Sequence, residues 1–229
     1  MIGAAIASVH QVTERTLGLI MAFGSGVLIS AIAYDLVADA YRTAGGVGIT
    51  AGIFSGALAF FAGDMLIDRA GGKQRKSIQR TEEGSAKAIV LGAVLDGIPE
   101  SVVVGLSLLT GEGLSIAVLA AVFLSNLPEA MAATTGLVAA GARRSRVLLM
   151  WTAVALVSAT AAAIGYAALG DASVGSIAYV QAFAAGAILT MLADTMMPEA
   201  FEHGGAVAGL ATTLGFVLAF GLSVSEQSV

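Results

Sequence analysis

The sequence has 229 residues, of which 57% are hydrophobic and 12% are charged, with a formal net charge of −5 and a mean hydropathy of +0.89. These values exclude an ordinary soluble domain, because long uncharged runs repeated along a chain are typical of a polytopic helical membrane protein. The absence of cysteine excludes disulfides and thiolate metal ligands.

Seven apolar runs are long enough to cross a bilayer as helices of about twenty residues. We expect these spans at residues 17–39, 48–66, 88–109, 114–140, 147–169, 177–197 and 206–223. Residues 1–9 are apolar but too short to span, so they are expected to be the end of a first helix or a short surface segment. The predicted fold class is therefore all-α: residues 1–229 form a single transmembrane helical bundle of seven to eight spans.

The basic residues predict the orientation of these spans. Ten of the eleven lysines and arginines fall on one side of the alternating spans, and only Arg42 lies on the other. The positive-inside rule places the side with ten in the cytoplasm, together with the polar stretch 69–87, which is expected to be a basic loop. The chain is thus expected to be a multi-pass protein of a cell membrane (plasma or inner membrane) with its C-terminus outside.

Each of the three prolines is followed by glutamate, and two of these pairs lie in the middle of predicted spans. The pairs are Pro99-Glu100, Pro128-Glu129 and Pro198-Glu199. A charged side chain at a helix centre in a bilayer costs about 2.5–3.5 kcal/mol on insertion scales. A proline inside a helix removes one backbone hydrogen bond, so the carbonyls of Leu95 and Leu124 are expected to be freed to face a ligand or water. Irregular backbone at membrane depth is tolerated where it lines a protein cavity.

Further polar side chains share a helix face with these glutamates. Asp96 lies four residues before Glu100, and Asn126 lies three residues before Glu129. Two such helices packed together are expected to bring all four side chains around one point. Three carboxylates that close repel one another unless they are protonated or bridged by a cation. The sequence therefore predicts a buried cation site, and the alternative is that each glutamate is a protonated, hydrogen-bonded core residue beside a kink.

Other titratable residues have less specific interpretations. Asp35 and Asp194 are each expected to be a gate, a second metal ligand or an interfacial residue. Asp64 and Asp68 lie near the basic loop, and they are expected to pair with Arg69 or to be solvated on a lipid-facing side. The helix end around His203 is expected to be a solvated terminus, with a transient metal site as the alternative.

At the two Pro-Glu segments the chain resembles the ZIP (ZRT/IRT-like) family of divalent metal transporters. That family's fourth helix typically reads H-N-x-P-E-G and its fifth reads H/D-x-P-E-G. The corresponding segments here are Asp96-Gly97-Ile98-Pro99-Glu100-Ser101 and Ser125-Asn126-Leu127-Pro128-Glu129-Ala130. The resemblance covers most of the chain from Arg15 onward, and the paired Pro-Glu helices are its specific part.

The resemblance also implies which residues bind the metal. Glu100 and Glu129 match the family's ligands outright, whereas Asp96 and Asn126 match as changed ligands. The remaining two ligand positions are lost: Gly97 replaces an asparagine, and Ser158 stands about where some bacterial members have a glutamate.

The resemblance implies a helical bundle of eight spans, often a homodimer, that moves zinc, iron or manganese inward by alternating access. Zinc is the ion the family implies first, but a site of carboxylates and one amide favours harder ions such as Mn²⁺ or Fe²⁺. The expected partners are the metal ion and the lipid bilayer, and no cofactor is required. Nucleic-acid binding is not expected, because the basic residues lie in loops without interleaved aromatics.

Two other functions remain as alternatives. A degenerate membrane sensor or partner protein that no longer transports is favoured by the losses at Gly97 and Ser158, and is opposed by Asp96, which keeps a costly ligand in the span. An intramembrane enzyme that uses the paired carboxylates as acid and base is opposed by the lack of an arranged nucleophile or histidine metal triad. We therefore expect a protein that is not an enzyme.

Overall fold

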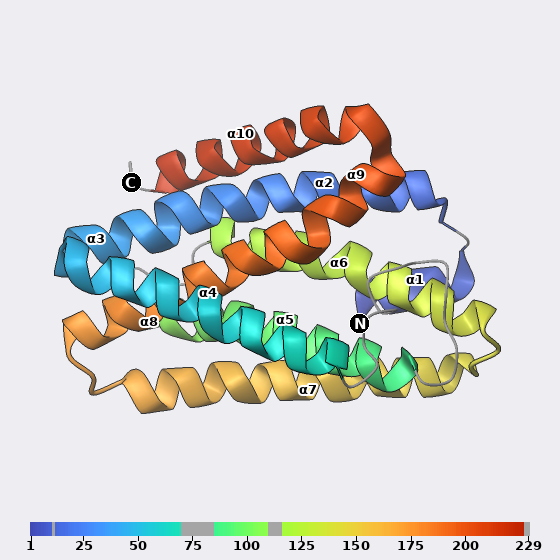
Figure 1. The fold of residues 1–229 in the computed structure, drawn as a ribbon, viewed down its shortest axis with the longest axis horizontal. Coiled ribbons are helices and arrows are strands. Elements are labelled where there is room, and N and C mark those ends of the chain that lie inside the picture. The colour runs from blue at the N-terminus through green and yellow to red at the C-terminus, as the bar shows by residue number, and fades with distance from the viewer. Residues whose placement is uncertain (11, 70–84, 110–115, 227–229) are drawn as a thin grey trace.

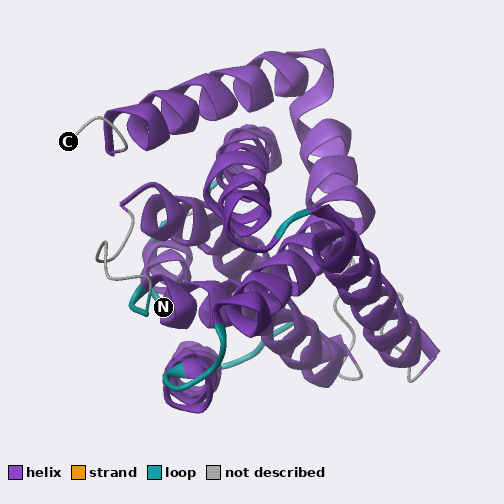
Figure 2. Ribbon diagram, turned by 90° about the vertical axis from the view of Figure 1, so that its left-hand side faces the viewer, coloured by secondary structure: helices purple, strands orange, loops and turns teal. Residues whose placement is uncertain are grey.

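The structure is a computed structural model that describes residues 1–10, 12–69, 85–109 and 116–226. Within these ranges every regular element is a helix, and the helices are joined by short connections (Figures 1 and 2). In chain order they are α1 (Ile2–Val9), α2 (Glu14–Ala31), the π-helical turn η1 (Ile32–Val37), α3 (Ala38–Ala44), α4 (Gly46–Arg69), α5 (Ser85–Ser107), α6 (Ile116–Ala139), α7 (Arg144–Leu169), α8 (Val174–Met191), the π-helical turn η3 (Leu192–Met196), α9 (Met197–Gly204), the 3₁₀ turn η4 (Gly205–Val207) and α10 (Ala208–Glu226). Most of the basic loop predicted at 69–87 lies outside the described residues.

Six segments of the described chain are long and apolar enough to cross a membrane. They are Glu14–Ala44, Gly46–Arg69, Ile89–Ser107, Val118–Ala139, Arg144–Leu169 and Val174–Glu226. The last segment contains both α8 and α10, between which the chain reverses at Gly205 (Figure 1). It therefore corresponds to two of the predicted spans, 177–197 and 206–223. The prediction of an all-helical, multi-pass membrane bundle is confirmed.

Residues 13–69 and 173–226 form two copies of one structural unit, 160 residues apart. Helices α2 and α8 begin at Glu14 and Val174 and end at Ala31 and Met191. A π-helical turn and a short helix follow in both copies, and then a glycine with a positive φ, 78° at Gly45 and 64° at Gly205, turns the chain into a long helix. Helices α2 and α8 run in opposite directions (Figure 1), so the two copies are inverted relative to each other. The sequence analysis did not predict this repeat.

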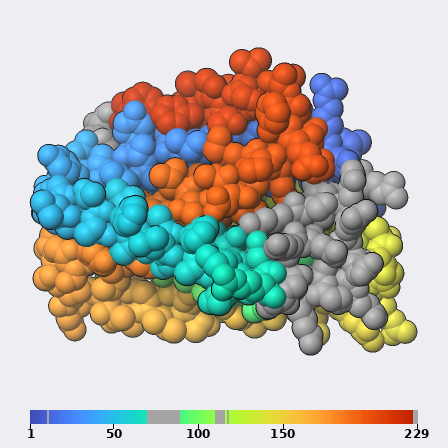
Figure 3. Space-filling view, viewed as in Figure 1, coloured from blue at the N-terminus to red at the C-terminus, as the bar shows by residue number. Residues whose placement is uncertain are grey.

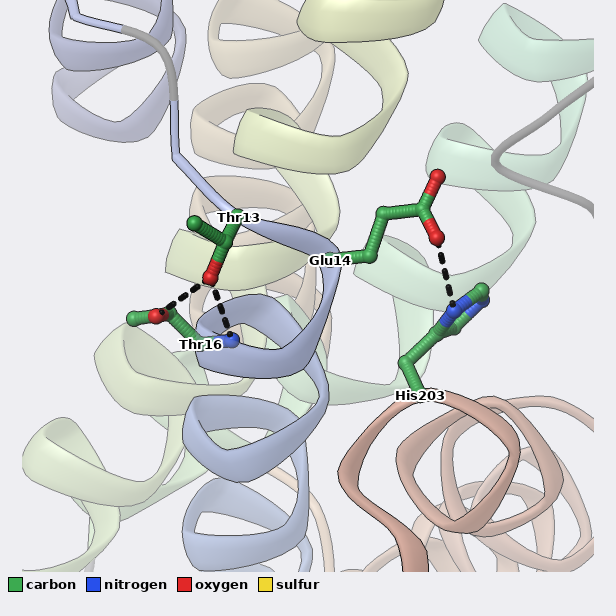
Figure 4. A network of polar contacts seen from close by, with 4 residues as sticks. All are labelled: Thr13, Glu14, Thr16 and His203. Atoms are coloured by element: carbon green, nitrogen blue, oxygen red, sulfur yellow. Dashed lines mark hydrogen bonds and ion pairs between the residues drawn. The ribbon is translucent and has the colours of Figure 1, made fainter.

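The helix caps repeat as well. The Thr13 hydroxyl accepts a hydrogen bond from the backbone N–H of Thr16 at the start of α2, and its oxygen lies 2.8 Å from the Thr16 hydroxyl (Figure 4). At the start of α8, Ser173 caps the N–H of Ser176 in the same way, and again the two hydroxyl oxygens are 2.8 Å apart. Such caps satisfy backbone donors that a helix leaves unpaired at its N-terminus.

Two pairs of parallel helices hold the repeats together, α2 with α10 and α4 with α8, and each pair takes one helix from each repeat. Figure 3 shows α4 and α8 side by side on one face. Within both pairs the backbones touch at reciprocal glycines. In α2 with α10, a β-carbon added to Gly26 would lie 1.9 Å from the Thr212 oxygen, and one added to Gly215 would lie 2.1 Å from the Phe23 oxygen. In α4 with α8, a β-carbon added to Gly56 would lie 1.9 Å from the Phe183 oxygen, and one added to Gly186 would lie 1.9 Å from the Ile53 oxygen. Small residues permit this close approach in membrane helices.

We predict that Gly56→Ala destabilises the protein, because its β-carbon would clash with the backbone oxygen of Phe183 and force α4 and α8 apart. Overpacking of this kind costs about 1–3 kcal/mol or more, which a lower midpoint of thermal unfolding in detergent would report. The matched control is Gly48→Ala on the same helix, where a β-carbon meets nothing within 4 Å. Equal effects of the two substitutions would contradict the prediction.

Candidate metal-transport site

Helices α5 and α6 carry the two Pro-Glu segments inside the bundle. Pro99 and Pro128 both lie in the interior of their helices. Glu100 is 2% exposed and Asp96, one turn earlier on α5, is 8% exposed. A carboxylate buried to this degree is costly unless hydrogen-bond donors face it.

The donors to Glu100 come from α6. Ser125 Oγ donates to Glu100 Oε1 at 2.8 Å, and Asn126 Nδ2 donates to Glu100 Oε2. The Asn126 amide also donates to the Val122 carbonyl at 2.9 Å. Both amide protons are then in use, so Oδ1 is the atom through which Asn126 is able to bind a cation. The contact joins two helices at the residues that the sequence singled out.

The four predicted ligands are therefore brought together only in part. Glu100 bonds to Asn126, and Asp96 is close enough to Glu100 for their charges to interact. Glu129 is half-buried, one turn beyond Asn126 on α6. In the described residues no group of three or more histidine or acidic side chains is arranged to hold a metal ion. The expected meeting of three carboxylates is not present in this conformation, in which Glu100 faces neutral donors, and the metal site stays a prediction.

Ser125 is the residue at this site that the sequence reasoning missed. It is 2% exposed and contributes one of the two donors to Glu100. Its signal in the sequence was only its place, directly before Asn126 in the second Pro-Glu segment. A hydroxyl group donates its proton to a carboxylate, and its oxygen is also able to accept a hydrogen bond or to coordinate a cation.

The backbone oxygen that Pro128 frees is covered by a neighbouring helix. A β-carbon at Gly24 of α2 would lie 2.8 Å from the Leu124 oxygen. The glycine thus lets the α2 backbone pack directly against this carbonyl. The part of α6 around Pro128 therefore contacts α2 at this carbonyl and α5 at Glu100.

The two positions at which the resemblance predicts lost ligands face each other across α5 and α7. A β-carbon at Gly97 would lie 3.1 Å from Ser158 Oγ. Further along the same helix pair, a β-carbon at Gly105 would lie 2.4 Å from the Ala162 oxygen. Close helix packing therefore occupies the place where a second set of ligands would stand.

Asp35 and Asp194 both lie on π-helical turns, but their surroundings differ. Asp35, on η1, accepts a hydrogen bond from Ser223 Oγ of α10 at 3.0 Å. Asp194, on η3, is exposed. Neither residue reaches Glu100 through a hydrogen bond in the structure, and their predicted roles remain untested. Single π-helical turns inside helices occur frequently at functional sites.

The expected solvation is wrong for two side chains, whereas the expected pairing of Asp64 with Arg69 stays a prediction. Asp64 is 6% exposed, so its side chain lies inside the bundle. The His203 side chain is 7% exposed, and its Nδ1 lies 3.7 Å from the Glu14 carboxylate (Figure 4). This burial follows from contact between α9 and the start of α2, where a β-carbon at Gly18 would lie 2.8 Å from His203 Cβ.

Comparison with known proteins gives one distant relative. No family model matches the chain. The sequence is 24% identical over 188 residues to a protein of Arabidopsis thaliana named "Putative zinc transporter At3g08650". The match covers 81% of this chain and 30% of that protein, so the chain spans less than a third of the relative's length.

We predict that Ser125→Ala destabilises the protein by about 1–3 kcal/mol, the usual cost of leaving a buried acceptor unsatisfied. Thermal unfolding in detergent measures the change. The matched control is Thr135→Ala on α6, because the Thr135 hydroxyl donates only to the Met131 carbonyl of its own helix in the hydrogen bonds described. The difference between the two variants should shrink in a Glu100→Leu background, which has no acceptor for the Ser125 hydroxyl, and an undiminished difference there would show that Ser125 does not act through Glu100.

Proposed function

We propose that the chain is a membrane transporter of a divalent metal cation, with Glu100 as the central ligand between α5 and α6. The observation that carries the proposal is the buried carboxylate of Glu100, both of whose oxygens accept hydrogen bonds from the second Pro-Glu helix. An intramembrane ionisable residue is a functional-site hypothesis by default. The distant similarity to a protein named as a putative zinc transporter supports the same function.

In this proposal the cation replaces the donors. As the ion enters, the Ser125 hydroxyl and the Asn126 amide turn away from Glu100, and its two oxygens become ligands. Asn126 then offers Oδ1, and Asp96 and Glu129 complete a set of oxygen ligands from α5 and α6. Cation charge offsets the repulsion among the three carboxylates, which is the reason for them to converge only when the ion is bound.

The ligand set bears on which ion is carried. Zinc accepts carboxylate oxygen but is commonly bound through histidine and cysteine. Asp96 provides oxygen where the family resemblance expects histidine, and this favours Mn²⁺ or Fe²⁺ more than an imidazole would. We retain zinc as the first candidate because of the named relative, with manganese and iron next. The distribution of basic residues supports a C-terminus outside a cell membrane. Inward movement of the ion is what the family resemblance implies.

A non-transporting sensor or partner protein is the second candidate. The close contact between Gly97 and Ser158 favours it, because a site that has lost two ligand positions to helix packing has fewer ways to bind and release an ion. Equilibrium binding together with flux separates the two functions: a sensor binds metal without moving it.

We predict saturable uptake of at least one of Zn²⁺, Mn²⁺, Fe²⁺ and Cd²⁺ by sealed proteoliposomes that contain the protein. Glu100→Ala and Glu129→Ala should each abolish the flux, because each removes a carboxylate ligand from the predicted site. Asp171→Ala, in the exposed loop between α7 and α8, is the control that should retain it. Absence of flux of every ion, with folded protein correctly inserted, would overturn the transporter function.

We also predict that Asp96→His shifts selectivity toward zinc. An imidazole nitrogen in place of a carboxylate oxygen suits Zn²⁺ better than Mn²⁺. The ratio of zinc to manganese uptake should rise by roughly tenfold, which is about 1.4 kcal/mol of relative preference. A competition assay with both ions outside the same vesicles measures the ratio. An unchanged ratio would show that Asp96 is not a ligand.

A further inference from the structure

The inverted repeats place two similar pairs of polar side chains toward opposite ends of the bundle. Each pair has one member on a π-helical turn and one on a long helix. The pairs are Asp35 on η1 with Ser223 on α10, and Thr195 on η3 with Asp64 on α4. In the first pair the carboxylate is on the π-helical turn and the hydroxyl is on the long helix, and in the second pair the reverse holds. The distance of each residue along the chain from the glycine contact of its helix is the same in the two pairs.

The spacing is measured from the glycines at which the helices touch. Asp35 lies nine residues beyond Gly26, and Ser223 lies eight beyond Gly215. In the other pair of helices Thr195 lies nine residues beyond Gly186, and Asp64 lies eight beyond Gly56. Because the helices of each pair run parallel and rise about 1.5 Å per residue, both sets of side chains come level about 12–14 Å beyond the glycine contact.

The two pairs differ in whether their hydrogen bond is formed. Ser223 Oγ donates to Asp35 Oδ2 at 3.0 Å. Thr195 Oγ1 is buried and has no hydrogen-bond partner in the part of the chain that the structure describes. Asp64, the carboxylate level with it, is 6% exposed. A buried hydroxyl without a partner is uncommon, and it requires an explanation in a native structure.

We propose that these pairs are two alternating latches of the transporter. The Asp35–Ser223 bond holds α2 against α10 in the conformation described here. In the opposite conformation that bond opens, and Thr195 donates to Asp64, which holds α8 against α4 at the other end. This rests on the proposed function, because alternating access requires two conformations that close opposite ends. Inverted repeats provide them, since each repeat adopts in one conformation the arrangement of the other.

The π-helical turns suit this role. A π-helical turn carries an extra residue relative to an α-helix, and both latches place one side chain on such a turn. The glycine contacts meanwhile keep the two helices of each pair together along their shared length. Movement is thereby directed to the segments beyond the contacts, where the latch residues lie.

The absence of cysteine in the chain makes a direct test available. A reporter protein carries Asp64→Cys and Thr195→Cys, and disulfide formation requires the two Cα atoms to come within about 7 Å. The purified full chain is treated with diamide in proteoliposomes, and the disulfide is followed as loss of labelling by a maleimide of high mass. Addition of Ser223→Ala should increase the rate of cross-linking by about fivefold, because loss of one hydrogen bond shifts the equilibrium toward the opposite conformation.

Ser225→Ala is the matched control, because the hydrogen bond described for its hydroxyl is to the Leu222 carbonyl of its own helix. It should leave the cross-linking rate unchanged. Asp35→Leu opens the same latch because leucine has no hydrogen-bond acceptor, and it should act as Ser223→Ala does if that variant does not fold. A rate that neither variant raises, or that Ser225→Ala raises equally, would overturn the latches.

The same reporter separates failure of the latches from failure of the proposed function. Cross-linking depends on conformation and is measured without added metal. A latch response in a protein that moves none of the four ions would leave the latches standing and remove the transporter. Metal flux in a protein whose cross-linking rate does not respond to Ser223→Ala would support the transporter and remove the latches.

Discussion

Within a bilayer a buried carboxylate has to find its hydrogen bonds inside the protein, and this requirement at Glu100 organises the centre of the bundle. Its two oxygens face a hydroxyl and an amide of α6. Apart from this contact, α5 packs more extensively on α7 than on α6. The α5–α6 interface thus includes polar groups beside its apolar contacts, and in the proposed function an entering cation displaces them. In an apolar interface a cation could not replace the existing contacts, because apolar side chains provide no atoms that bind the ion.

The two helix pairs that touch at glycines follow the opposite rule. In α2 with α10 and α4 with α8, backbone meets backbone at glycines, where no side chain is left to change rotamer. Close packing of this kind tolerates few alternatives and behaves as a rigid unit. The chain therefore combines two stiff helix pairs with a polar centre. Since each stiff pair contains one helix from each inverted repeat, relative motion of the repeats is limited to regions beyond the glycine contacts.

The sequence predicted the parts of this structure that depend on one segment at a time. The spans follow from runs of uncharged residues, and the Glu100–Asn126 contact follows from helical spacing within two neighbouring segments. The sequence did not predict burial at His203 or Asp64. His203 is covered by the start of α2, which lies far away along the chain. Nor did the sequence predict the repeat. Gly26 and Gly186 are the same residue at corresponding positions of the two repeats. Asp35, however, corresponds to Thr195, and Ser223 corresponds to Asp64. Each repeat position therefore differs in residue type, although each pair still combines one carboxylate with one hydroxyl.

The losses at Gly97 and Ser158 have a structural consequence for a site of this kind. With α7 packed against Gly97, the remaining candidate ligands all belong to α5 and α6. When three helices supply the ligands, a shift of one helix leaves the other two in place. When two helices supply them, the arrangement of the ligands depends on the distance between those two helices alone. The neutral donors of α6 already set that separation at Glu100. In the proposed function, binding and release of a cation are then coupled to one helix–helix distance, which suits a carrier better than a permanent metal centre, whose ligands are held rigidly by outer contacts.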